Sequence, residues 1–193
     1  MPDEGISVFV LTSLGSATNT NEPYLDFLQC LLAHTDVPKV ISTSYGDDEQ
    51  TVPKSYAKRV CNTFAQLGAR GISFLCSSGD SGVGRNGACF SNDGKNSSRF
   101  LPSFPASCPW VTTVGGTEGF DPEVAAYDAI NDYASGGGFS DVFSQPWWQK
   151  TQVQSYIESL EGTYDGIYNK SGRAYPDIAA QVRDSIIYTS FLY

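Results

Sequence analysis

The chain has 193 residues, of which 40% are hydrophobic and 13% aromatic, a composition typical of a folded globular protein. Acidic residues outnumber basic ones by 21 to 12, which gives a formal net charge of -9. A nucleic-acid partner is therefore not expected, because phosphate binding requires a basic surface. No segment has the roughly 18 apolar residues that cross a bilayer, so we expect no membrane span. The first 17 residues lack a basic region and a long apolar run, and are interpreted as neither signal peptide nor anchor.

The spacing of apolar residues predicts alternating helices and strands along the first part of the chain. Residues 24–34 have apolar side chains at helical spacing, and residues 39–46 form a β-branched run that is typical of a strand. Residues 52–71 predict a long helix with one apolar face, bounded by a proline and two glycines. Residues 72–78 predict a second buried strand. This order of strand, helix and strand indicates a right-handed βαβ unit and an α/β fold with a parallel sheet.

The second half of the chain continues the pattern with shorter elements. Residues 109–117 predict another strand, and residues 146–160 predict a helix. Between them, the glycine run in residues 136–140, GGGFS, predicts a turn or a place where two backbones approach closely.

Two polar turns follow neighbouring strands of the predicted sheet. They are residues 44–49, SYGDDE, and residues 77–82, SSGDSG. Function in such sheets gathers at the carboxyl ends of the strands, so these turns form a candidate site. The alternative is that both are ordinary strand-end turns, which Gly, Asp and Ser favour.

The tetrapeptide GDSG also occurs around the nucleophile of chymotrypsin-like peptidases, which raises the question of whether Ser81 is a nucleophile. Such a serine needs a base, and the only histidine is His34, at the end of a predicted helix. A histidine at that position more often interacts with the helix dipole. Because chymotrypsin-like peptidases are also all-β, we reject this role for Ser81.

The cysteines bear on the cellular compartment. The chain has five cysteines, so at least one thiol is free. No Cys/His spacing of a zinc site occurs. Cys89 and Cys108 flank a polar loop, residues 84–98, that a disulfide would close in an oxidising compartment. Unpaired buried cysteines are the alternative. Asn96 and Asn169 begin NxS sequons, which are possible glycosylation sites of a secreted protein.

Several long motifs cover most of the chain. They are NEPYLDFLQ, VISTSYGDDEQTVP, RVCNTFAQLGARGISFLCSSGDSGVGRNGACFSNDGK, FLPSFPASCPWVTTVGGT, ASGGGFSDVF and GRAYPDIAAQ. These motifs resemble the sedolisin family of serine-carboxyl peptidases, and within it the fungal tripeptidyl-peptidases. The similarity runs from about Asn19 to Gln181. We therefore interpret residues 1–181 as a partial peptidase domain and residues 182–193 as an unmatched tail.

The resemblance implies a subtilisin-like α/β fold, incomplete at both ends, with a mostly parallel sheet and helices on both faces. It also implies a Ser-Glu-Asp triad and a separate aspartate in the oxyanion hole, which is Asp80 here. Ser44, Tyr45, Gly46 and Gly79 are expected to contact a peptide substrate. A carboxyl group donates a hydrogen bond to an oxyanion only when it is protonated, and burial with nearby carboxylates favours that form. Activity in acid is therefore expected.

Parts of the family pattern do not occur in this sequence. The motif that carries the catalytic Glu and Asp, and the GTSAS motif that carries the nucleophile, are both missing. The family's calcium ligands lie farther towards the C-terminus, so no metal ligand is expected here. The resemblance implies an extracellular monomer that acts on peptides or proteins. We expect the chain alone to be inactive, and the alternatives are an inactive peptide-binding paralogue or a non-functional truncated product.

Overall fold

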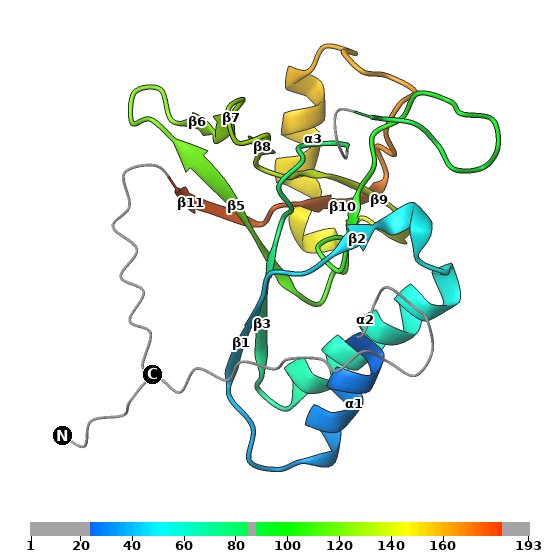
Figure 1. The fold of residues 1–193 in the computed structure, drawn as a ribbon, viewed down its shortest axis with the longest axis vertical. Coiled ribbons are helices and arrows are strands. Elements are labelled where there is room, and N and C mark those ends of the chain that lie inside the picture. The colour runs from blue at the N-terminus through cyan, green and yellow to red at the C-terminus, as the bar shows by residue number, and fades with distance from the viewer. Residues whose placement is uncertain (1–23, 85–87, 183–193) are drawn as a thin grey trace.

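The computed structural model describes residues 24–84 and 88–182 (Figure 1). The start of the family match near Asn19 and all but the first residue of the predicted tail lie outside the described residues. The helical elements are α1 (Tyr24–Ala33), η1 (Glu49–Thr51), α2 (Lys54–Ala69), η3 (Trp147–Gln149) and α3 (Lys150–Ser159). None of the described helices is both long and apolar enough to cross a membrane.

The central sheet has the parallel order β1-β3-β5-β11, with one short antiparallel strand, β6, beside β5. Its strands are β1 (Val40–Thr43), β3 (Ser73–Ser77), β5 (Thr112–Glu118), β6 (Val124–Ala125) and β11 (Ile178–Gln181). The expected α/β fold with a mostly parallel sheet is therefore confirmed.

Three two-stranded pairs, all antiparallel, lie beside this sheet. They are β2 (Asp47–Asp48) with β4 (Ser103–Phe104), β7 (Tyr127–Asp128) with β8 (Tyr133–Ala134), and β9 (Gly138–Ser144) with β10 (Gly172–Tyr175). The glycine run that predicted a turn therefore continues into a strand from Gly138 onwards. The predicted strand over residues 39–46 is likewise two elements, because the chain leaves the sheet after Thr43 and pairs with β4.

The main core lies between the sheet and the predicted long helix, α2, which connects β1 to β3. Its apolar face buries Val60, Phe64 and Leu67 completely. Burial of each such side chain stabilises the fold by about 1.5–3 kcal/mol. The Phe64 ring meets Phe74 of β3 edge-on, with 4.8 Å between ring centroids. Helix α1 packs on the same core, where the Tyr24 ring lies 5.8 Å from the Phe64 ring.

The helices of this core, α1 and α2, cover one face of the sheet (Figure 1). Ile41 packs towards them, whereas its neighbour Val40 points to the opposite face and is 60% exposed. Helix α3 lies beside the β9–β10 pair, where Tyr156 stacks on Phe139 with centroids 6.4 Å apart. Among the described residues, the helical covering of the central sheet is thus concentrated on one face.

The expected Cys89–Cys108 disulfide is wrong, because Cys108 is bonded to Cys61 on α2. The two Cα atoms of this disulfide are 5.7 Å apart, and both residues are buried in the main core. Cys89 is a free, half-buried thiol next to the Val83 carbonyl. Its closeness to Cys108 in sequence was misleading, because Cys108 packs with α2 in the main core whereas Cys89 lies outside that core, beside Val83.

Candidate functional site

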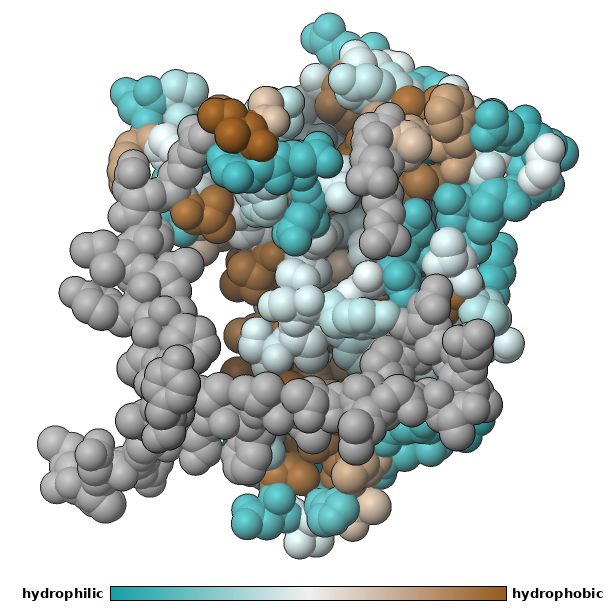
Figure 2. All heavy atoms as spheres, viewed as in Figure 1, coloured by the Kyte–Doolittle hydropathy of each residue, from teal (hydrophilic) through white to brown (hydrophobic). Residues whose placement is uncertain are grey.

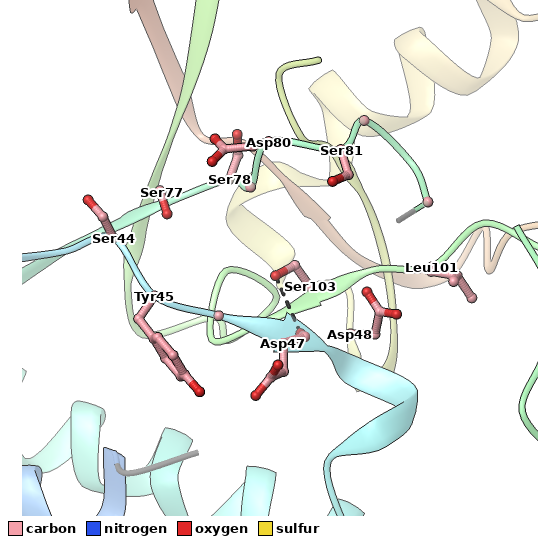
Figure 3. Close-up of a pocket in the computed structure, with 14 residues that line it drawn as sticks. Ser44, Tyr45, Asp47, Asp48, Ser77, Ser78, Asp80, Ser81, Leu101 and Ser103 are labelled. Carbon is pink, nitrogen blue, oxygen red and sulfur yellow. Dashed lines mark hydrogen bonds between the residues drawn. The ribbon is translucent and has the colours of Figure 1, made fainter. Parts of the chain in front are cut away.

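The two polar turns meet in one pocket of about 330 Å³ at the carboxyl ends of β1 and β3 (Figure 3). Residues 44–48 line one side and residues 77–82 line the other. Gly84, Leu101 and Ser103 complete the lining. The expectation that these turns lie close together is confirmed. Ser44, Tyr45, Gly46, Gly79 and Asp80, the predicted site residues, all line this pocket.

Helix α1 fixes the wall formed by residues 44–46. The Tyr24 hydroxyl donates a hydrogen bond of 2.7 Å to the Tyr45 carbonyl oxygen, and it lies 2.7 Å from Thr43 Oγ1. Gly46 allows the chain to pass close to β4, because a Cβ atom there would lie only 2.9 Å from the Phe104 carbonyl oxygen. This wall is therefore a backbone segment in a defined position, with the Tyr45 ring pointing away from Asp80 in Figure 3.

The opposite wall is the tight turn that carries Asp80. Gly79 and Gly82 have φ angles of 101° and 58°, a region that residues with a Cβ atom rarely adopt. Before the turn, the buried Ser78 donates its N–H to the Val114 carbonyl at 2.9 Å. The glycines thus let the chain turn sharply at the strand end and present Asp80 to the pocket.

The expectation that burial helps to keep Asp80 neutral is not met in the described chain, where Asp80 is exposed. Two more acidic residues, Asp47 and Asp48, line the same pocket from the wall opposite Asp80 (Figure 3). No basic side chain is among the described residues of the lining. The pocket therefore attracts cationic groups more than anions.

A second backbone segment, residues 134–136, is hydrogen-bonded to the Asp80 turn. Ala134 donates its N–H to the Asp80 carbonyl at 2.8 Å, and Gly136 donates to the Gly79 carbonyl at 2.8 Å. Gly82 in turn donates to the Ala134 carbonyl at 2.9 Å. A Cβ atom on Gly136 would lie 2.0 Å from the Ser78 carbonyl oxygen. The close backbone approach predicted from the glycine run is therefore confirmed.

Glu49, the last residue of the predicted polar turn, is not part of the pocket. It is 2% exposed, and its carboxylate accepts hydrogen bonds from Ser107 Oγ at 2.6 Å and Ser140 Oγ at 2.5 Å. The backbone N–H of Asp141 donates to its other oxygen at 2.7 Å. Burial raises the pKa of Glu49, and these hydrogen bonds oppose that effect in part. Glu49 is a structural link between η1, β9 and the loop after β4.

The geometry agrees with the rejection of Ser81 as a histidine-activated nucleophile. His34 follows α1 and precedes the amino end of β1, and its Nδ1 lies 2.7 Å from the Cys30 carbonyl oxygen. Arg70, which precedes β3, donates to the His34 carbonyl at 2.6 Å. Ser81 instead follows the carboxyl end of β3. Within residues 24–84 and 88–182, its hydroxyl group has no hydrogen-bond partner.

The described residues do not fit a metal site. Across these two ranges, no group of three or more His, Cys, Asp or Glu side chains is placed to hold a metal ion. The calcium that the family resemblance implies is therefore not assigned to any described residue.

The two sequons differ in the availability of their asparagine. Asn96 is exposed on the loop after β3. This loop lies at the upper right of Figure 2 and carries residues of hydrophilic or intermediate hydropathy. The Asn169 amide is engaged, because its Nδ2 donates to the Ser140 carbonyl at 2.7 Å. Its Oδ1 accepts a hydrogen bond of 2.9 Å from Ser171 Oγ, the hydroxyl of the same sequon.

We propose that Asn96 is the glycan acceptor and that Asn169 stays largely unmodified after folding. Expression in a glycosylating fungal host followed by glycopeptide mass spectrometry is expected to find the glycan on Asn96. Asn96→Gln should then remove most of the glycan mass, whereas Asn169→Gln should not. High occupancy of Asn169 in the wild type would contradict this prediction.

Comparison with known proteins shows which molecules this chain is similar to. The chain is 53% identical over 167 residues to tripeptidyl-peptidase SED4 of Arthroderma otae, covering 84% of this chain and 26% of that relative. It is 48% identical over 172 residues to tripeptidyl-peptidase sed4 of Aspergillus fumigatus, covering 86% of this chain and 28% of that relative. No family model matches the chain.

A solved structure gives the same result at the level of the fold. It is Pseudomonas sedolisin, a serine-carboxyl proteinase complexed with two molecules of pseudo-iodotyrostatin. The TM-score is 0.51 at 27% sequence identity, and the match covers 82% of this chain and 39% of sedolisin. The chain spans about a quarter of the length of the curated relatives that it matches. The sequence and the fold thus agree, and the chain belongs to the sedolisin family of serine-carboxyl peptidases.

Proposed function

We propose that this chain supplies the oxyanion side and one substrate wall of an acid-active tripeptidyl-peptidase. The observation that carries this proposal is the joint pocket of residues 44–48 and 77–82, with Asp80 on its rim. The names of the relatives, which are tripeptidyl-peptidases at about half identity, support the reaction class. The buried Cys61–Cys108 disulfide favours the oxidising environment of a secreted protein.

The backbone of the pocket is suited to an extended peptide. Residues 44–46 connect β1 to β2 along the pocket wall, and a substrate strand would pair with this segment through main-chain hydrogen bonds. The scissile carbonyl would then lie between this segment and the Asp80 turn. A protonated Asp80 carboxyl would donate a hydrogen bond to the oxyanion that develops during attack on the carbonyl carbon. Asp80 is exposed in this chain, so its carboxyl group is accessible to solvent.

The charge of the pocket supports release of short peptides from a free N-terminus. Three carboxylates, those of Asp47, Asp48 and Asp80, line a pocket without a basic side chain among its described residues. A free α-amino group is cationic in acid and would be attracted to this negative potential. An acetylated N-terminus has no such charge.

We also propose that the isolated chain binds peptides as a monomer without hydrolysing them. The described residues place no base beside Ser81, and His34 precedes the amino end of β1. Catalysis would then need groups contributed by the longer peptidase architecture that the relatives have. Peptide binding without turnover is also what an inactive paralogue would show, so activity must be tested in a complete peptidase.

The test has two parts. In the first, fluorescence anisotropy of a labelled oligopeptide is measured with the 193-residue chain at pH 4, and mass spectrometry monitors cleavage. Saturable binding without cleavage is expected, with weaker binding of the N-acetylated peptide. A chain that melts cooperatively but does not bind would overturn the cleft proposal.

In the second part, residues 24–182 replace the aligned segment of Arthroderma otae tripeptidyl-peptidase SED4, giving a chimeric peptidase. The chimera is expected to release tripeptides at acid pH. A chimera that folds, binds peptide and does not cleave it would show that this chain is an inactive relative.

A further inference from the structure

Tyr133, which the sequence did not single out, lies next to Asp80 in the fold. Ser81 and Ala134 form a parallel β-bridge, and the preceding residues of that register are Asp80 and Tyr133. Neighbours in a parallel register present their side chains to the same face of the sheet, because the side-chain period of a strand is two. The register therefore places the Tyr133 phenol and the Asp80 carboxyl group on the same side.

Strand β5 also constrains the position of the Tyr133 phenol. A Cβ atom built on Gly116 would lie 2.7 Å from the Tyr133 hydroxyl oxygen, so the phenol reaches directly over the backbone of that glycine. Gly116 donates its N–H to Ser135 Oγ at 2.8 Å, which ties the segment of Tyr133 to the same strand. The hydroxyl group thus lies at the carboxyl end of β5, beside the turn that follows β3.

The β7–β8 hairpin fixes the backbone position of Tyr133. Asp128 and Tyr133 are paired across the two strands, and the Asp128 carboxylate closes the turn by accepting the N–H of Ile130 at 2.9 Å. Ala126, before the hairpin, donates to the Gly116 carbonyl at 3.0 Å and accepts the Ser135 N–H at 2.9 Å. These bonds fix the backbone of Tyr133 beside the Asp80 turn.

The electrostatics are consistent with this geometry. The pKa of Tyr133 is raised, mainly because the phenol is partly desolvated and also because the charge of Asp80 disfavours the phenolate. A neutral phenol is a hydrogen-bond donor throughout the acid and neutral range. The Tyr133 phenol therefore remains a hydrogen-bond donor near the Asp80 carboxyl group at acid and neutral pH.

We propose that Tyr133 is a positioning residue for Asp80, holding the Asp80 carboxyl group in the orientation that meets the oxyanion. This inference rests on the proposed oxyanion role of Asp80. Segment 134–136 fixes the backbone of the turn, and Tyr133 restricts its side chain. Asp80, and not the Tyr133 phenol, contacts the substrate. The contribution of Tyr133 therefore appears in kcat and not in peptide binding.

The contact itself is tested in the 193-residue chain, without reference to catalysis. Tyrosine labelled with ¹³C at Cζ is titrated by NMR, with the Tyr133 signal assigned by its loss in Tyr133→Phe. Asp80→Asn is expected to lower the pKa of Tyr133, because a negative charge is removed from its neighbourhood. The signal of Tyr127, on the same hairpin and 61% exposed, should not move. An unchanged Tyr133 titration would overturn the proposal.

The positioning role is tested in the chimeric peptidase. Tyr133→Phe is expected to lower kcat about three- to tenfold, because the Asp80 carboxyl group would be oriented less well, with KM and melting temperature nearly unchanged. The matched control Tyr127→Phe should leave kcat unchanged. A normal kcat in Tyr133→Phe, despite a coupled titration, would show that the contact is structural only. An inactive parent chimera would count against the proposed function, while the NMR titration would still decide whether Tyr133 and Asp80 interact.

Discussion

Asp80→Ala is expected to lower kcat of the chimeric peptidase about 100- to 1000-fold, the usual effect of removing one oxyanion-hole donor. The reason is that Asp80 is placed on the rim of the pocket by two glycines with positive φ, and by backbone hydrogen bonds from segment 134–136. The loss should appear in kcat and much less in KM, because the donor acts on charge that develops only in the transition state. Steady-state kinetics with a free N-terminal peptide measures both constants.

Asp80→Asn distinguishes a hydrogen-bond donor from a base. The asparagine amide donates at every pH, whereas an aspartate donates only when it is protonated. If Asp80 is the donor, the Asn variant should keep more activity than the Ala variant and should lose less of it as the pH rises. If Asp80 acted instead as a general base, both variants would be equally inactive. Ser81→Ala is the matched control within the same turn, and it should retain most of the activity.

Glu49→Ala is expected to destabilise the 193-residue chain by about 3 kcal/mol. The substitution leaves a cavity and removes the acceptor of two serine hydroxyls and of the Asp141 N–H in a completely buried place. Urea unfolding followed by circular dichroism measures the loss. Glu158→Ala, on the exposed surface of α3, is the control and should change stability by less than about 0.5 kcal/mol. Equal stability of the two variants would show that the Glu49 cluster contributes little.

Glu49→Gln tests the pH dependence that the raised pKa implies. A carboxyl group whose pKa is higher in the folded state binds its proton more tightly there, so folding is favoured while the group is neutral. The stability that Glu49 contributes is therefore fully present below its ordinary pKa of 4.5 and is lost as the pH rises through the folded value.

The measurement is the difference in unfolding free energy between wild type and Glu49→Gln at several pH values. This difference should favour the wild type most at low pH and should fall as the pH increases. Each unit by which the pKa is raised corresponds to about 1.4 kcal/mol of that change. A difference that grows with pH would mean that the serine hydrogen bonds outweigh desolvation, with the pKa of Glu49 lowered instead.

The sequence by itself determined the parts of this protein that depend on local pattern. The apolar spacing of residues 52–71 gave α2 within two residues at each end, because one face of a helix must be buried. The alternation of strand and helix predicted the parallel sheet, and the strand-end rule predicted that the polar turns 44–49 and 77–82 lie close together, although Glu49 itself lies outside the pocket. The long motifs identified the family, which the comparisons with known peptidases agree with.

Only the tertiary structure decided the features that depend on contacts between distant residues. The sequence placed Glu49 in the polar turn, but packing buries it between Ser107 and Ser140. Cys108 pairs with Cys61 because helix and loop share one core, and no local signal distinguishes that partner from Cys89. Tyr133 lies beside Asp80 only because a β-bridge joins segments more than fifty residues apart. Local sequence sets the conformation of each segment, whereas such pairings are set by the free energy of packing the whole chain.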